Sequence, residues 1–188
     1  MIVTQKADNL VPYSKPLDYT YFKKNASEGT GMAATFKIAD LKNCHEIVEL
    51  YNEVTLKLLR KGIHQWDYPW RVDCVKDAIQ KREVYKAELD GSIVGAFWIG
   101  EANNFSGLLV EKGSLYLSKI AILPHFQGHG IGREIVSFAR SFANNTGTAM
   151  YLDCWAGNDK LRQFYLECGL EYLGDLPEED YLISVYKS

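Results

Sequence analysis

The sequence predicts a mixed α/β fold in which helices flank a mostly antiparallel sheet. Three observations support this prediction. Short segments rich in β-branched and aromatic residues alternate with amphipathic helical segments. An Asp90-Gly91 pair separates two such apolar runs, which is typical of a two-residue β-hairpin turn. A further apolar run, Leu115 to Leu123, stops at Pro124 and leads through a glycine-rich turn into a helix.

Composition limits the class of protein. The 188 residues are 47% hydrophobic and 24% charged, as expected for a globular domain with a sizeable core. A net charge of −3 argues against a general nucleic-acid binder. The four cysteines show no zinc-ligand spacing, so no structural metal is expected. No apolar run reaches the roughly 18–20 residues of a membrane span, and no export signal is visible, so we expect a cytoplasmic location.

The N-terminal segment reads differently from the rest of the chain. Residues 1–31 are mostly polar and contain Pro12 and Pro16. Such a stretch buries little apolar surface, so it is predicted to be an extension or arm outside the main core. Residues 32–188 are then predicted to form one domain.

The first half of this domain begins with a short strand over residues 35–39. Asp40 suits the N-cap of a helix that ends at Gly62. Its apolar residues recur at the spacing of one helix face: Ile47, Val48, Tyr51, Val54 and Leu58. An aromatic-rich loop over residues 63–70 separates this helix from a shorter one over residues 72–81.

The second half supplies most of the predicted sheet. In chain order, the expected elements are strands over 83–89, 92–100 and 115–123, a helix over 131–144, a strand over 150–155, a helix over 158–168, and strands over 170–173 and 181–186. Asn158 suits the N-cap of the last helix, and Gly169 suits its left-handed stop.

The glycine-rich turn is the most informative motif. Its sequence is Gln127-Gly128-His129-Gly130-Ile131-Gly132, at the mouth of a helix. Glycines allow close backbone approach, and the helix start offers unpaired N–H groups, which together favour an anion such as a pyrophosphate. The dinucleotide fingerprint fails because position 133 is Arg, and the nucleotide-hydrolase loop fails because no Gly-Lys-Ser/Thr follows. The alternative is an ordinary connecting turn.

The pattern Gln-x-x-Gly-x-Gly after an apolar strand and Pro resembles the acyl-CoA-binding motif of the GNAT superfamily of N-acyltransferases. Asn158, followed by Leu161, Phe164, Tyr165 and Gly169-Leu170, is similar to the family's later motif. The two motifs also stand in the family's order, and the resemblance covers roughly residues 35–187. It implies a sheet whose strands splay apart to admit acyl-CoA, with acetyl-CoA as co-substrate and no metal.

The resemblance also implies a set of cofactor-binding residues. Main-chain groups of Ile120, Ala121 and Ile122 would pair with pantetheine as a substitute strand, while their side chains belong to the core. The pyrophosphate would be bound by Gln127, Gly128, His129, Gly130, Ile131, Gly132 and Arg133. The side chains of His129 and Arg133 either add charge beside a phosphate or are solvated surface groups. Asn158 either bonds the pantetheine arm or caps its helix, and both roles are compatible.

For catalysis, the resemblance implies that Tyr165 is the general acid that protonates the departing thiolate, although an aromatic residue on an amphipathic helix is also typical of a core. The attacking amine must lose a proton, so a base is needed. The strand before Pro124 offers no obvious carboxylate. Asp153 on the next strand is the candidate base, or else a buried carboxylate bonded to backbone; His125 and Glu111 are weaker candidates.

The loop over residues 63–70 is the predicted wall of the acceptor site. Trp66, Tyr68 and Trp70 would enclose an acceptor, and Asp67 would attract its amine charge. The alternative is a hydrophobic cluster that pins the loop. His64 is interpreted as a surface or packing residue.

Together these features predict an N-acetyltransferase that moves an acetyl group from acetyl-CoA directly to the primary amine of a small molecule. Two alternatives remain: a protein or peptide N-acetyltransferase, and a non-catalytic acyl-CoA-binding regulatory module. The expected partner is a small-molecule amine acceptor, with no nucleic acid and no membrane, and a homodimer is left open. Cys154 and Cys168 have no readable histidine partner, so no acyl-enzyme is expected.

Overall fold

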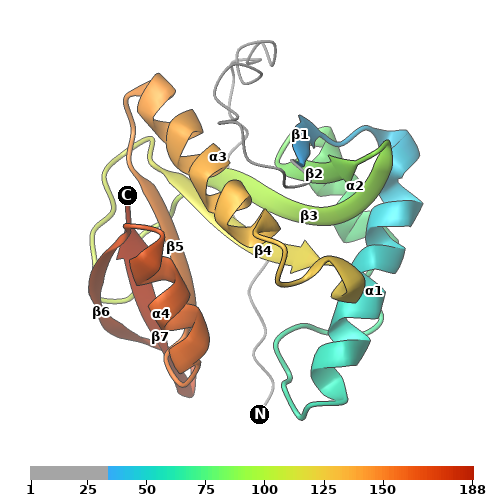
Figure 1. Cartoon of the computed structure of the whole chain (residues 1–188). Coiled ribbons are helices and arrows are strands. Elements are labelled where there is room, and N and C mark those ends of the chain that lie inside the picture. Colours follow the sequence, from blue (N-terminus) through green and yellow to red (C-terminus); the bar gives the residue numbers. More distant parts are fainter. Residues whose placement is uncertain (1–33) are drawn as a thin grey trace.

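The computed structural model describes residues 34–188, so the predicted arm over residues 1–31 lies outside the described residues. The strands are β1 (Thr35–Ile38), β2 (Val84–Leu89), β3 (Ser92–Glu101), β4 (Leu115–Ile122), β5 (Met150–Trp155), β6 (Glu171–Glu178) and β7 (Tyr181–Lys187). The α-helices are α1 (Cys44–Leu59), α2 (Val72–Gln80), α3 (Ile131–Thr146) and α4 (Asp159–Glu167), and short 3-10 turns cover Leu41–Asn43 and Pro124–Phe126 (Figure 1). The predicted order of elements is confirmed.

The strands form one seven-stranded sheet in the order β1-β2-β3-β4-β5-β7-β6. Every neighbouring pair is antiparallel except β4 and β5, which are parallel. Helices α3 and α4 lie on one face of this sheet, and α1 and α2 lie on the other (Figure 1). The predicted mixed, mostly antiparallel sheet flanked by helices is therefore confirmed.

The parallel contact between β4 and β5 is very short. Only Leu115 pairs with Met150, and Tyr116 with Tyr151. Beyond these pairs the two strands diverge, so among the described strands none pairs with the rest of β4, up to Ile122, on this side (Figure 1). The predicted splaying of the strands is present at this point of the sheet.

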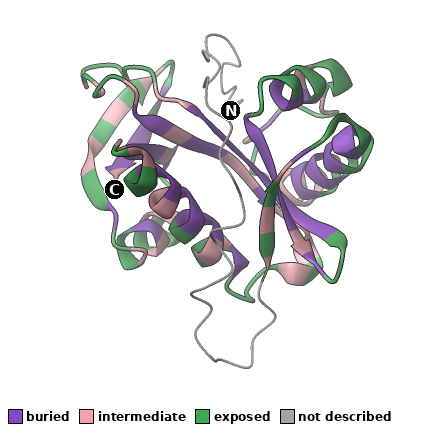
Figure 2. Ribbon diagram, turned by 90° about the horizontal axis from the view of Figure 1, so that it is seen from above, coloured by how far each residue is buried: buried purple, intermediate pink, exposed green. Residues whose placement is uncertain are grey.

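Two buried clusters hold the helices to the sheet. One lies under α3 and α4 and includes Phe97, Ile135 and Leu152. The other lies under α1 and α2 and includes Ile47 and Val75. Figure 2 shows burial concentrated in the central strands and on the sheet-facing sides of the helices. Each large apolar side chain buried in this way stabilises the fold by about 1.5–3 kcal/mol.

A bulge interrupts β4 next to the point where the strands part. Ala96 of β3 pairs with Ala121, but Trp98 pairs with Ser118, so one residue of β3 faces two residues of β4. Lys119, one of these two, has a φ of 50°, which is uncommon for a residue with a side chain. The Tyr51 hydroxyl on α1 donates a hydrogen bond to the Lys119 carbonyl at 2.8 Å. Bulges redirect side chains, and this one is fixed in place by α1.

The local signals at the turns behave as expected, with one exception. Asp90 and Gly91 have φ values of 49° and 82°, as a tight hairpin turn requires. The exception is β6, which extends to Glu178 rather than ending near residue 173. Its Gly174 and Pro177 resemble a loop in sequence, but an edge strand tolerates both, because Pro removes a donor that has no partner there.

The helix boundaries follow from glycine chemistry at both ends of α3. Gly130 is its N-cap with φ of 87°, and Gly147 is its C-cap with φ of 66°. Both angles lie in the left-handed region that glycine adopts without steric cost. In the part of the chain that the structure describes, no helix combines the length and the apolar character needed to cross a membrane.

Candidate functional site

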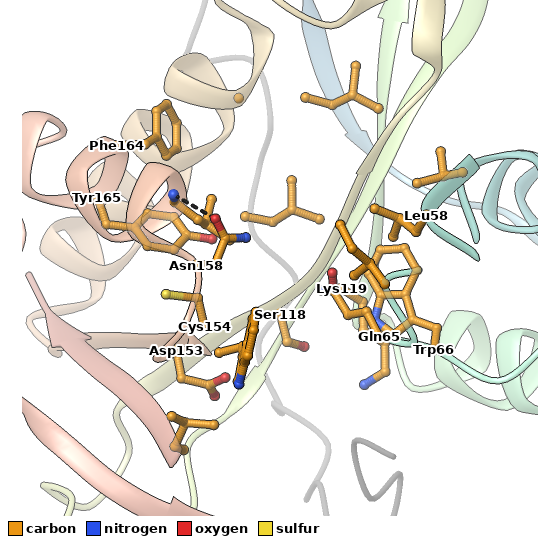
Figure 3. A pocket seen from close by; sticks show the side chains of 18 of the residues that line it. Leu58, Gln65, Trp66, Ser118, Lys119, Asp153, Cys154, Asn158, Phe164 and Tyr165 are labelled. Carbon is orange, nitrogen blue, oxygen red and sulfur yellow. Dashed lines mark hydrogen bonds between the residues drawn. The ribbon is translucent and has the colours of Figure 1, made fainter. Parts of the chain in front are cut away.

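A cavity of about 520 Å³ opens where β4 and β5 part. Its walls come from α1 and the loop after it, from β4 and β5, and from α4 and β7. Figure 3 shows Asn158, Phe164 and Tyr165 on one side, and Leu58 and Trp66 on the other. Segments far apart in the sequence therefore meet at a single site.

The glycine-rich turn lies at one end of this cavity, to which Gln127 and Gly132 contribute. Gly128 and Gly130 have φ values of 85° and 87°. Within residues 34–188, the backbone N–H groups of residues 128–132 have no hydrogen-bond partner. Five unpaired donors at the start of a 16-residue helix have the geometry that attracts an anion, because the helix dipole adds to the attraction of the N–H groups. The predicted pyrophosphate-binding segment thus has the donors that such a group requires.

The open edge of β4 runs from this turn into the cavity. Ile120 and Ile122 line the cavity, whereas Ala121 is buried against the α1 and α2 side. The Gln127 side-chain amide donates to the Ile122 carbonyl at 2.8 Å, and Lys57 donates to the Gln127 amide oxygen at 3.3 Å. Gln127 therefore ties the turn to the strand, so that the two predicted cofactor-binding segments form one continuous surface.

The charged side chains near the turn have different roles. The Arg133 guanidinium donates to the Glu167 carbonyl oxygen at 2.9 Å and pairs with the Glu167 carboxylate at 3.3 Å. Its backbone N–H is also used, because it donates to the Gly130 carbonyl. Arg133 thus joins α3 to α4, and the structure does not bring its charge to the turn. His129 is exposed within the turn itself.

Asn158 combines the two roles expected of it. Its side-chain oxygen accepts a hydrogen bond from the Leu161 backbone N–H at 3.1 Å, which caps α4. The same residue lines the cavity, where its amide nitrogen faces inward (Figure 3). The helix cap therefore fixes a polar group at the cavity wall.

Tyr165 lies on the next turns of α4 and also lines the cavity. It is only 5% exposed, and its ring packs against Tyr186 with the centroids 5.4 Å apart. No described residue hydrogen-bonds its hydroxyl, which leaves the proton available. Burial raises the pKa of the Tyr165 phenol above its ordinary value, so the group stays protonated at neutral pH.

Asp153 on β5 faces Tyr116 on β4, and the Tyr116 hydroxyl donates a hydrogen bond to its carboxylate. Burial raises the pKa of Asp153 to about 6, although the hydrogen bond from Tyr116 opposes that rise. The Glu178 carboxylate raises this pKa further, and the Lys119 ammonium lowers it. The partner of Asp153 is therefore a side chain on the neighbouring strand rather than the backbone.

The predicted acceptor loop is only partly at the cavity. Trp66 lines it and is 8% exposed. Trp70 instead stacks on Tyr51, with the centroids 4.3 Å apart, and its indole N–H donates to Thr55. The structure does not bring Asp67, Tyr68 or Trp70 to the cavity, and Asp67 and Tyr68 are exposed elsewhere. Trp70 therefore belongs to an aromatic cluster that holds the loop in place, which is the alternative role expected for this loop.

Several cavity residues were missed by sequence reasoning. They are Tyr116, Trp155, Tyr181 and His64, which was interpreted as a surface or packing residue. The period-two alternation of β5 does place Trp155 on the same face as Asp153, so that signal was available. Trp155 is 49% exposed, and its ring lies so close to Gly157 that an added Cβ there would fall 2.4 Å from it.

The two cysteines considered as nucleophiles, Cys154 and Cys168, are not activated. Burial raises the pKa of the Cys154 thiol to about 12, and burial also raises that of Cys168. Thiols in this state are poor nucleophiles, because the thiolate is the reactive species. His125 and Glu111 do not reach the cavity. Among residues 34–188, no group of three or more His, Cys, Asp or Glu is arranged to hold a metal ion.

Comparison with known proteins gives a family and a fold. The model of the acetyltransferase (GNAT) family matches residues 44–170, which is more than half of the chain. The protein named "Uncharacterized N-acetyltransferase YesJ", from Bacillus subtilis (strain 168), is 34% identical over 65 residues. These residues are 34% of this chain and 36% of that protein, so the match spans about a third of the curated relative.

Solved structures match over most of their length. An acetyltransferase of the GNAT family from Listeria monocytogenes has a TM-score of 0.67 and 20% identity, covering 82% of this chain and 94% of that one. The putative acetyltransferase yncA from Salmonella typhimurium, solved with its cofactor acetyl-CoA, has a TM-score of 0.63 and 20% identity, covering 83% and 93%. At this identity the likeness establishes the shared fold.

The raised pKa of Asp153 makes stability depend on pH in a defined direction. Its folded-state pKa of about 6 exceeds the unfolded value of about 3.9. Ionisation therefore costs free energy in the folded state only, and stability falls as pH rises between these two values. Asp153→Asn removes this cost, so it should stabilise the protein by about 2–3 kcal/mol more at pH 7.5 than at pH 4.

Urea unfolding of both proteins at the two pH values measures this difference. Asp67→Asn is the control, because it removes an exposed carboxylate on the surface. Its effect on the free energy of unfolding should be within about 0.5 kcal/mol, as for most surface substitutions. An equal effect of Asp153→Asn at pH 4 and pH 7.5 would show that Asp153 ionises at no cost in the folded protein.

Proposed function

We propose, because this chain belongs to the GNAT family of acetyltransferases, that its domain over residues 32–188 transfers an acetyl group from acetyl-CoA to the primary amine of a small molecule. One observation carries the proposal. The cavity between β4 and β5 joins the unpaired N–H groups of residues 128–132 to a protonated phenol and a half-buried carboxylate. This combination of groups suits acyl transfer from a diphosphate-bearing carrier.

The residues present fit acetyl-CoA. The N–H groups of residues 128–132 suit its pyrophosphate, since a helix start attracts anions. The unpaired edge of β4 offers backbone groups to the amide-bearing pantetheine arm, in the way that an added strand would pair. The inward amide of Asn158 adds one more polar contact from α4.

Asp153 is proposed as the general base. When bound, acetyl-CoA supplies the acetyl group as a thioester, whose carbonyl carbon is open to attack by an amine. A carboxyl with a pKa of about 6 is largely ionised at pH 7.5, so Asp153 can accept the proton of the amine, directly or through water. Tyr116 holds the carboxylate in place by its hydrogen bond.

Tyr165 is proposed as the general acid. Its raised pKa keeps the proton on the phenol at neutral pH, and no residue in the described part of the chain hydrogen-bonds its hydroxyl. It can therefore donate a proton to the sulfur that leaves. Asp153 comes from β5 and Tyr165 from α4, so the proposed base and the proposed acid are carried by two different elements that line the same side of the cavity (Figure 3).

The aromatic lining of the cavity supports a small acceptor. Trp66, Trp155 and Tyr181 all line the cavity, and aromatic side chains of this kind suit a small ligand, whereas a peptide acceptor would favour a shallow polar groove. The test is an amine panel with acetyl-CoA that follows the release of free thiol. Turnover of small amines is expected. Turnover of peptides alone would favour a protein acetyltransferase, and acetyl-CoA binding without any thiol release would favour a regulatory module.

The glycine turn can be tested at its centre. Gly130→Glu places bulk and negative charge among the unpaired N–H groups, so it should weaken CoA binding by at least about 100-fold in calorimetry. Gly147→Glu is a matched control, because Gly147 has the same left-handed conformation at the other end of the same helix. It should bind CoA normally. Equal CoA affinity in the two folded variants would place the pyrophosphate elsewhere.

Tyr165→Phe removes only the proposed acidic proton. It should lower kcat by roughly 100-fold and leave the Kd for acetyl-CoA within about twofold, since the ring still packs against Tyr186. Steady-state kinetics and calorimetry measure the two quantities. Tyr172→Phe on the exposed edge strand is the control. Unchanged kcat in Tyr165→Phe, under conditions where chemistry limits the rate, would exclude the acid role.

The base should be visible in the pH profile of kcat/KM. With an acceptor whose own amine pKa lies below about 5, activity should fall about tenfold per pH unit below the Asp153 pKa of about 6, because protonated Asp153 cannot accept a proton. Asp153→Asn should abolish this limb and lower the rate at pH 7.5. A limb near pH 6 that persists in Asp153→Asn would assign the base to another group.

A further inference from the structure

One charged group at the cavity has no part in the chemistry described so far. Lys119, at the β4 bulge, lines the cavity on the side of α1. Its ammonium lies over the ring of Trp98, 4.4 Å from the centroid. The bulge directs this side chain, and the hydrogen bond from Tyr51 to the Lys119 carbonyl holds the backbone that carries it.

The part of the chain that the structure describes places no carboxylate within ion-pair distance of this ammonium. Within residues 34–188, the ion pairs closer than 4.0 Å involve other lysines and arginines, and none includes Lys119. Glu83 and Asp153 both act on it from a greater distance and raise its pKa, but burial lowers that pKa by more. A cation held among apolar groups without a counter-ion costs free energy, which a bound anion would recover.

A second unsatisfied donor lies on the same side of the cavity. The indole N–H of Trp66 is buried and has no hydrogen-bond partner among the described residues, although Trp66 lines the cavity and is only 8% exposed. Buried donors in proteins are rarely left unpaired. Figure 3 shows Trp66 and Lys119 on one wall of the cavity and Asp153 on the opposite wall. One wall therefore offers donors and positive charge, and the other offers a carboxylate.

We propose that the acceptor is an amine that also carries a carboxylate, and that Lys119 binds this carboxylate. The inference rests on the proposed function, since it names the class of amine that the same cavity accepts. The carboxylate of the acceptor pairs with the Lys119 ammonium, and Trp66 offers its indole N–H to the same group. This orientation turns the amine toward Asp153, where it loses its proton. A purely cationic amine gains no such pair and is repelled by Lys119.

The rest of the lining combines the polar side chains of His64, Gln65 and Ser118 with apolar and aromatic ones. Among the latter, Trp155, Tyr181 and Ile63 favour an apolar connection between the amine and the carboxylate. A lysine side chain within a protein has an amine but no nearby carboxylate on the same residue. The charge pattern thus favours a free amino acid or a related small zwitterion.

Matched pairs of acceptors test the proposal. Each pair is a free amino acid and its carboxamide, for leucine, phenylalanine, β-alanine and 4-aminobutyrate, assayed by thiol release from acetyl-CoA. The unaltered protein should prefer the acid form of at least one pair by roughly tenfold or more in kcat/KM, as expected for a charged hydrogen bond. Lys119→Met should reduce this preference to about twofold or less, with kcat/KM for the carboxamide nearly unchanged.

The controls separate recognition from folding and from chemistry. Lys119→Arg should keep most of the preference, because it keeps the charge. Lys42→Met removes an exposed lysine far from the cavity and should change nothing. Acetyl-CoA affinity, measured by calorimetry, should be the same in all variants. If Lys119→Met does not fold, Lys119→Gln replaces it, and the acid preference of the unaltered protein remains a test by itself.

Three results would overturn the inference. Turnover of acids and carboxamides with equal efficiency would reject a carboxylate-bearing acceptor, while leaving the proposed acetyltransferase function standing. An equal loss of kcat for both members of a pair in Lys119→Met would show that Lys119 acts on the acyl group rather than on the acceptor. No thiol release with any amine would reject the proposed function and this inference together.

Discussion

The two-residue pairing of β4 with β5 is the constraint on which the site depends. Backbone N–H and C=O groups need partners, and a strand in the middle of a sheet normally finds them on both sides. Here the partner strand turns away after Tyr116 pairs with Tyr151, and the remaining edge of β4 faces a cavity. An extended ligand with amide groups can take the place of the missing strand. The short pairing with β5 therefore leaves backbone groups of β4 available to the ligand proposed above.

The bulge in β4 joins this edge to the acceptor side. An ordinary strand would send Lys119 to one face in strict alternation, but the extra residue changes the alternation at this point. The Tyr51 hydroxyl satisfies the Lys119 carbonyl from α1. Since Tyr51 is also stacked with Trp70, the loop after α1 and the bulge are held by the same aromatic group. The acceptor wall and the strand edge are thus positioned together.

Local signals made the fold and one end of the site predictable. The turn over residues 127–132 could be predicted because glycine spacing and the helix that follows are encoded in adjacent residues. Tyr116 and Tyr181 could not, because their place at the cavity depends on which strands are neighbours and on the register between them. Asp67 and Tyr68 show the reverse: their composition suggested a site, but loop geometry turned them to the surface. Residue type alone does not decide which way a loop side chain points.

The two charges on opposite walls also influence each other. The Lys119 ammonium lowers the pKa of Asp153, and the Asp153 carboxylate raises that of Lys119. An anion bound beside Lys119 cancels part of its positive field, so the pKa of Asp153 rises and the carboxylate becomes a stronger base. An acceptor with a carboxylate would thereby increase the basicity of the group that deprotonates its own amine. Binding and activation would then be linked by simple electrostatics, without a conformational change.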